Sequence, residues 1–242
     1  MKNKTFTMLI GVGIMFILCS CGTTHYVTED RNFPTEIEPQ EAVVIILNTY
    51  SKHDVCKESR SSEQGFEGCV RNSMIEANPK IKIVSAKDFR RMVFNGRSFE
   101  DTPRSPKDIL SFFHNQEAHQ QLAKAEIRYL IVLNVITSNT KKQFSLEPTE
   151  HGAVFGRKGF RYTRITAIII DMKRLKESGR VTSTSTGPAG YGVGLVMFIL
   201  PVPFGYTSPT ETATCSRIGE EILNFIVGRG ESKPHIEGQN GE

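Results

Sequence analysis

The chain has 242 residues, of which 38% are hydrophobic and 23% charged, and it contains no Trp. This composition is typical of a globular protein and excludes a disordered, collagen-like or polytopic membrane chain. If Lys2 and Lys4 belong to a leader, 28 basic residues remain against 26 acidic ones, a net charge of +2. Because this excess is small, it does not indicate nucleic-acid binding. We expect one compact domain that binds no nucleic acid.

The first twenty residues have the pattern of a secretory signal peptide. A basic start is followed at residues 5–18 by an uncharged apolar run, TFTMLIGVGIMFIL, which is too short for a comfortable permanent membrane span. The run ends in Leu18-Cys19-Ser20-Cys21, which resembles the lipoprotein box of bacteria. By that resemblance Cys21 becomes the mature amino terminus and carries a covalent diacylglycerol and a further acyl chain such as palmitate. The alternative is an ordinary signal peptide with Cys21 unmodified.

The residues after Cys21 predict where the protein is held. Two or more acyl chains anchor a protein stably to a membrane. Gly22 stands where a signal for retention in the inner membrane usually has Asp, so the resemblance favours the periplasmic face of the outer membrane. Residues 21–41 are polar and contain Pro34 and Pro39, which predicts a flexible tether with a span of about 25 Å. Export also permits disulfides.

Residues 42–228 predict a globular domain in which strands and helices alternate. Residues 42–47 (AVVIIL) have the pattern of a strand buried on both faces, and residues 65–77 that of an amphipathic helix. Further strands are predicted at residues 81–84 and 129–136. Two helices are predicted to start at the N-cap residues Ser85 and Ser105.

The second half of the domain predicts a hairpin and a final helix. Residues 160–172 and 180–186 flank a charged, Gly-ended connection, which is typical of antiparallel strands. Residues 187–194 read as a flexible glycine-rich stretch. Ser208 to Glu211 form a capping box with Pro209 at the first helical position, and the helix is predicted to stop near Gly228. Residues 229–242 are predicted to be a disordered tail.

This order predicts an α/β fold, a single three-layer domain with a mixed β-sheet and helices on both faces. It resembles the periplasmic lipoproteins of the CsgG and LpoB type, whose domain is similar to the amino-terminal domain of TolB. The likeness covers residues 42–228 as an order of elements, including IKIVSA at 81–86, RYLI at 128–131 and IIID at 168–171. It implies a non-enzymatic module in envelope assembly, secretion or regulation.

Three thiols remain if Cys19 leaves with the leader and Cys21 is acylated. We expect a disulfide between Cys56 and Cys69, the pair closest in sequence, with Cys69 to Cys215 as the alternative. No pair has the close spacing of a zinc knuckle, so we expect no metal site.

The sequence offers little catalytic chemistry. His114 and His119 are five residues apart and would point about 140° from one another on a helix. Neither a Gly-x-Ser-x-Gly elbow nor a His-Glu-x-x-His helix is present. The glycines at 187–194 are not followed by a helix, as a phosphate loop requires. We expect no enzyme and no cofactor beyond the lipid on Cys21, and no His within hydrogen-bond reach of a Ser or Cys in a pocket.

The apolar stretch at residues 195–206, LVMFILPVPFGY, is the strongest candidate for a contact surface. It is either an edge strand tucked against the sheet or an exposed patch for a partner or a bilayer. If it is exposed, the contact residues are Phe198, Ile199, Leu200, Val202 and Phe204.

The predicted function is that of a lipid-anchored, non-enzymatic protein-interaction module in cell-envelope assembly or maintenance. Its expected partners are the membrane and envelope proteins, and the number of copies that associate is left open. One alternative is a subunit of an oligomeric CsgG-like secretion channel. Paired membrane strands would need alternating segments of about ten residues each, and only residues 195–206 come near that pattern. A further alternative is an unrecognised periplasmic hydrolase.

Overall fold

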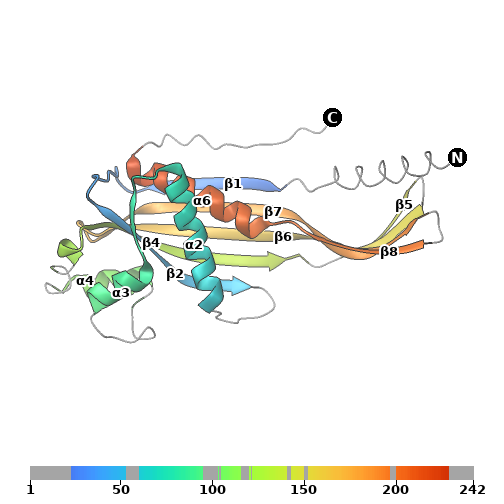
Figure 1. The fold of residues 1–242 in the computed structure, drawn as a ribbon, viewed down its shortest axis with the longest axis horizontal. Coiled ribbons are helices and arrows are strands. Elements are labelled where there is room, and N and C mark those ends of the chain that lie inside the picture. The colour runs from blue at the N-terminus through green and yellow to red at the C-terminus, as the bar shows by residue number, and fades with distance from the viewer. Residues whose placement is uncertain are drawn as a thin grey trace.

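The computed structural model describes residues 23–52, 60–94, 103, 105–115, 120, 122–140, 143–149, 152–196 and 200–228. Over these residues it has one mixed sheet of eight strands with helices against both faces (Figure 1). This confirms the predicted α/β single domain. The leader, Cys21 and the predicted tail lie outside the described residues.

The strands of the body follow the order β1-β7-β6-β4-β2-β3. Three of them, at one side of the sheet, are mutually parallel: β4 (Ile127–Asn139), β2 (Ala42–Lys52) and β3 (Lys82–Val84). The others run antiparallel to their neighbours: β1 (Thr24–Arg31), β7 (Lys176–Val196) and β6 (Gly152–Asp171). The predicted hairpin is therefore confirmed, with strands longer than the sequence indicated.

The β-branched run of β2 explains why it lies inside the sheet. Val43 and Ile45 belong to the core on one face, whereas Val44 and Ile46 belong to the core on the other. Because successive side chains of a strand point to opposite faces, a strand buried on both must be apolar at every position.

Helices cover both faces of the sheet. On one face, α2 (Arg60–Ala77) and α6 (Thr210–Val227) contribute Met74, Ile222 and other residues to the larger core. On the opposite face, α3 (Ala86–Phe94) and α4 (Pro106–Phe113) pack a cluster of phenylalanines against the sheet. Among the described residues, no helix is both long and apolar enough to cross a membrane.

The three predicted helix starts lie within one residue of the observed ones, but only two of the three predicted N-caps are confirmed. The hydroxyl of Ser105 accepts a hydrogen bond from the Asp108 amide, and Ser85 does the same for Asp88. Ser208, in contrast, does not cap α6. Its amide and its hydroxyl both donate to the carbonyl of Pro188 in β7, at 3.1 and 2.9 Å. Ser208 ends a strand ladder, so its side chain is not available to the helix that follows.

The predicted tether is also wrong, because the part of it at Thr24–Arg31 is β1, paired with β7 over eight residues. The prolines that suggested a tether, Pro34 and Pro39, come after this strand. The polar residues of β1 suit its position at the edge of the sheet, where one side of the strand faces solvent.

The glycine-rich stretch at residues 187–194 is not a flexible loop but the continuation of β7, with β6 on one side and β8 (Leu200–Thr207) on the other. Gly187 is required at its position, since an added Cβ would lie 2.4 Å from that of Ser208. Backbone pairing with the neighbouring strands holds this stretch in an extended conformation although most of its residues are glycines.

Beyond the ends of β1 and β4, four strands continue away from the helices. This segment, which we call the arm, consists of β5 (Gln143–Thr149), residues 152–160 of β6, residues 187–196 of β7, and β8. It projects to the right in Figure 1. The arm therefore contains two adjacent hairpins, where the sequence indicated only the apolar stretch at residues 195–206.

Candidate functional site

Three of the predicted contact residues, Leu200, Val202 and Phe204, lie on β8, the outer strand of the arm. Val202 pairs with Gly194 and is 48% exposed, so at this position β8 is an exposed edge strand. Leu200 and Phe204 pair with Val196 and Gly192. Phe198 and Ile199 lie outside the described residues.

A larger apolar surface lies on the other face of the arm. Phe155 of β6 pairs with Leu146 of β5 and with Val193 of β7. Because directly paired residues share a face of a sheet, these three side chains form a row. The next row has Arg157 in the centre. We call the two rows the apolar face: Phe144, Leu146, Phe155, Arg157, Tyr191 and Val193.

The exposure of the apolar face distinguishes it from the rest of the molecule. Its five hydrophobic side chains are between 37% and 70% exposed. In the described part of the chain ten large hydrophobic side chains are exposed, and seven of them lie on the arm. Because these side chains are concentrated on the arm, we take the arm as the candidate interaction surface.

The apolar face continues the side of the sheet that α2 and α6 cover. Ile165 and Ala167 of β6 are buried in the core beneath these helices. At the start of the arm, Arg161 binds Glu211 of α6 at 2.6 Å, and α6 begins there. Further out, none of the described helices covers the alternate positions of β6, and Phe155 is exposed there. This surface was not predicted from the sequence, although Phe144 and Leu146 alternate with polar residues.

Three prolines lie along the two outer edges of the arm. The backbone amide of Ser208 points to β7, so the backbone amides of alternate residues in β8 also point to β7. The backbone nitrogens of Pro201 and Pro203 lie at the positions in between, which face away from β7. On the other edge, the Phe160 amide donates to the hydroxyl of Thr140, so the backbone amides at even positions of β6 point toward β5. Pro148 of β5 pairs with Ala153, an odd position, so its backbone nitrogen faces outward. Proline has no N–H, so at these positions each edge lacks a donor for a further strand.

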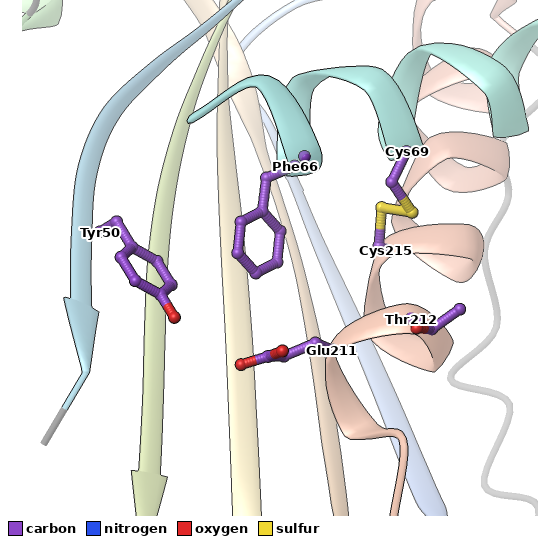
Figure 2. A pocket seen from close by; sticks show the side chains of 7 residues that line it. Tyr50, Phe66, Cys69, Glu211, Thr212 and Cys215 are labelled. Carbon is purple, nitrogen blue, oxygen red and sulfur yellow. A yellow bond between two sulfur atoms is a disulfide. The ribbon is translucent and has the colours of Figure 1, made fainter. Parts of the chain in front are cut away.

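A cavity of about 250 Å³ lies where the arm meets the body (Figure 2). The Tyr50 and Phe66 rings are in contact there, with centroids 5.4 Å apart. Burial raises the pKa of Tyr50, and the nearby Glu211 carboxylate raises it further. The cavity has room for a small side chain and is lined by residues of β2, α2 and α6: Tyr50, Gly65, Phe66, Cys69, Glu211, Thr212 and Cys215.

The disulfide in the wall of this cavity joins Cys69 to Cys215, so the preferred pairing of Cys56 with Cys69 is wrong and the alternative is confirmed. The Cα atoms of the pair are 6.1 Å apart because α2 and α6 pack side by side on the sheet. The prediction relied on closeness in the sequence, but the packing of α2 against α6 brings together two cysteines that are 146 positions apart. Cys56 lies outside the described residues.

One histidine lies within reach of a serine, but outside the cavity. Nδ1 of His25 is 2.8 Å from the hydroxyl of Ser185, its direct cross-strand partner. Ser185 is completely buried, and neither residue lines the cavity. Nδ1 of His114 is hydrogen-bonded to the Leu110 carbonyl, and His119 lies outside the described residues. Within the described ranges no three His, Cys, Asp or Glu side chains form a group that would hold a metal ion.

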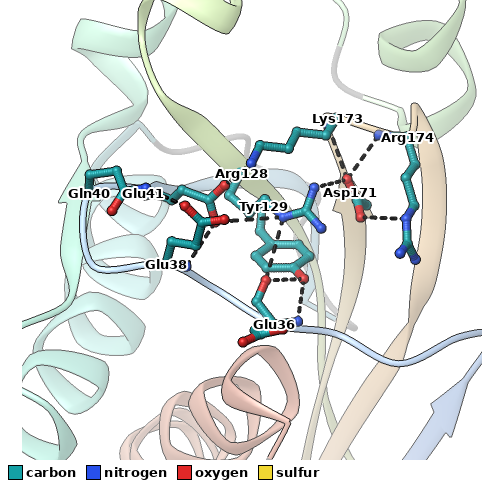
Figure 3. A network of polar contacts seen from close by, with 9 residues as sticks. All are labelled: Glu36, Glu38, Gln40, Glu41, Arg128, Tyr129, Asp171, Lys173 and Arg174. Atoms are coloured by element: carbon teal, nitrogen blue, oxygen red, sulfur yellow. Dashed lines mark hydrogen bonds and ion pairs between the residues drawn. The ribbon is translucent and has the colours of Figure 1, made fainter.

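A network of charges at the other end of the sheet holds the segment after β1 (Figure 3). Arg128 of β4 binds the buried carboxylate of Asp171 at 2.7 Å and lies 3.7 Å from Glu41. The side chain of Lys173 also binds Glu41, and this hydrogen bond raises the pKa of Lys173. The hydroxyl of Tyr129 donates to the Glu36 carbonyl. These contacts are structural, because they fix residues 36–41 against the sheet.

Together, the fold and the arm define an α/β protein with a projecting sheet that exposes apolar side chains. No protein-family model matches the chain, and no curated protein matches it either.

Several solved structures are similar to this chain over most of its length, with low sequence identity and TM-scores below 0.5. PelC from Paraburkholderia phytofirmans, solved as a dodecamer, is 9% identical with a TM-score of 0.39, over 84% of this chain and 99% of that one. A hypothetical protein from Chlamydia trachomatis is 10% identical with a TM-score of 0.31, over 77% and 98%. Lipoprotein GNA1162 from Neisseria meningitidis is 12% identical with a TM-score of 0.28, over 76% and 99%. At these values we draw no functional conclusion from the likeness.

Proposed function

We propose that the protein is a lipid-anchored, non-enzymatic interaction module at the periplasmic face of the bacterial outer membrane, and that it binds envelope proteins through the arm. The observation that carries the proposal is the arm itself. It holds most of the exposed large hydrophobic side chains of the described residues, away from the helices that cover the body. The order of elements, which resembles that of CsgG-type and LpoB-type lipoproteins, supports the same class of function.

The start of β1 relates the proposed anchor to the arm. Thr24, its first residue, pairs with Thr186, and the arm begins at the next residue of β7. Cys21 is three residues before Thr24, and three residues span at most about 11 Å. Acyl chains on Cys21 would therefore hold the base of the arm close to the membrane.

The anchor is tested by replacing Cys21 with Ala. The intact mass of the natural protein should include the diacylglycerol and the acyl chain, and the variant should move from the membrane fraction to the soluble periplasm. Retention of Cys21→Ala in the membrane, or an unmodified natural protein, would contradict the anchoring.

The binding role is tested by photocrosslinking in whole cells. A photoreactive residue is placed at Phe155 on the apolar face, at Val202 on the opposite face of the arm, and at Met92 on α3 as a control. Met92 is exposed to a similar extent, 43%, but lies on the body. At least one arm position should give a discrete protein adduct that Met92 does not give. Identical adducts from all three positions, or none from the arm, would refute the proposal.

A second candidate, a subunit of an oligomeric secretion channel, is favoured by one observation. The arm supplies two adjacent hairpins, β5 with β6 and β7 with β8, where the sequence offered one stretch. Light scattering on the non-acylated protein separates the candidates. A stable ring of many copies would favour the channel, and a monomer would favour the module.

A further inference from the structure

We propose that the apolar face of the arm rests on the surface of the bilayer that holds the Cys21 anchor, so that the arm is a second membrane contact. This inference depends on the anchoring proposed above and names the lipid surface as the occupant of the apolar face. Protein partners would then meet the opposite face of the arm or the body.

The anchor and the arm are close enough together for the arm to reach the bilayer. The chain passes from Cys21 to the base of the arm in three residues, and β7 continues from there for ten residues, from Gly187 to Val196. At the usual rise of a strand, ten residues extend about 33 Å. A sheet of this length, held at its base within about 11 Å of a lipid anchor, lies within reach of the membrane surface along its length.

The side chains of the apolar face have the chemistry of residues found at membrane surfaces. Aromatic and aliphatic side chains with one cation suit the boundary between acyl chains and headgroups, because Tyr places its hydroxyl in the polar layer and Arg extends its guanidinium to phosphate. Tyr191 and Arg157 are paired in one row. On the opposite face, β6 carries Val154, Gly156, Lys158 and Phe160, and their partners in β7 are glycines except for Pro188. Across the two central strands the exposed large hydrophobic side chains are therefore more numerous on the apolar face.

The edges of the arm determine whether it can cross a bilayer or only lie on its surface. A single arm has two open edges, and unpaired backbone groups cannot be satisfied in the hydrocarbon core. The outward-facing Pro148, Pro201 and Pro203 remove donors that a neighbouring strand would need. At the interface, water and headgroups satisfy the remaining edge groups, so the arm is suited to lie along the surface.

Because the chain contains no Trp, a single introduced Trp reports on its own environment. The test uses non-acylated protein from residue 22 onward, which retains every described element, with vesicles of phosphatidylethanolamine and phosphatidylglycerol. Phe155→Trp probes the apolar face, and Val202→Trp is the matched control on the opposite face. We expect a blue shift and quenching by brominated lipid for Phe155→Trp only. No response from Phe155→Trp, or equal responses from both variants, would overturn the inference.

A second measurement uses vesicle co-sedimentation. Phe144→Asn combined with Phe155→Asn should weaken binding about tenfold or more, since two large apolar side chains are lost from the contact. Phe160→Asn combined with Val202→Asn, on the opposite face, should leave binding within about twofold. Circular dichroism checks that the variants are folded. Equal losses from both pairs would contradict the proposal.

Two outcomes separate this inference from the functions proposed above. Release of a trapped dye from the vesicles would show that the arm crosses the bilayer, which would overturn surface binding and favour the channel. Protein adducts from the arm without any vesicle binding would leave the interaction module in place and refute the lipid contact alone.

Discussion

Cys69 and Cys215 are joined by a disulfide although 146 positions separate them in the sequence. The bond connects α2 to α6 above the larger core, in the wall of the cavity at the base of the arm. It ties an early helix to the last one, and both helices cover the face of the sheet that continues into the arm.

Replacing both cysteines by Ala should lower the free energy of unfolding substantially. Closing a loop of this length stabilises by about 5 kcal/mol in the chain-entropy model, and we expect a loss up to that size. Urea unfolding followed by circular dichroism measures it. Cys56→Ala, which leaves this disulfide intact, is the control and should unfold at the same urea concentration as the natural protein.

The close contact of α2 and α6 depends on Gly219. A Cβ at this position would lie 2.6 Å from that of Ser73 and 2.9 Å from the Val70 carbonyl oxygen. Gly219→Ala should therefore destabilise the protein by about 1–3 kcal/mol. Gly68→Ala is a matched control in α2, where nothing lies within 4 Å, and should stabilise by about 1 kcal/mol through helix propensity. Stabilisation by both changes would show that the helices are not so closely packed.

The ion pair of Arg128 and Asp171 is buried, with side-chain exposures of 12% and 1%. Asp171→Asn removes one charge and leaves Arg128 in a poorly solvated site, so we expect a loss of about 3 kcal/mol. The amide of Glu36, which is bound to the Tyr129 hydroxyl, should also exchange faster with solvent.

Glu220→Gln is the control for that change, because its pair with Arg217 is exposed. It should cost at most about 1 kcal/mol. If the two variants lose equal stability, the network does not hold residues 36–41 in the way described.

The prolines of β8 should prevent two copies of the protein from pairing through the edges of their arms. Replacing Pro201 and Pro203 by Val restores two outward N–H groups and makes the arm edge able to pair with another strand. In light scattering, the double variant should form larger species than the natural protein does at the same concentration. Val202→Thr, which keeps both prolines, should have the same mass as the natural protein. A double variant of unchanged mass would show that the prolines do not protect this edge.

Local patterns predicted much of the body. The run AVVIIL indicated a strand buried on both faces, and Ser85 and Ser105 marked helix starts, because burial periodicity and caps depend on neighbours in the sequence. The same local reasoning failed at Ser208, whose hydroxyl binds Pro188 of a distant strand.

The amino-acid sequence alone determined the α/β class, the main strands and helices, and the stretch that becomes β8, since these follow from apolar periodicity within short windows. Only the tertiary structure decided that residues 24–31 form a strand, that the glycines at 187–194 lie within a ladder, that Cys69 pairs with Cys215, and that Leu146, Phe155 and Val193 form one exposed row. Each of these depends on partners far away in the chain. Strand register and helix packing determine which distant residues meet, and a pattern within a short stretch of sequence carries no information about these partners.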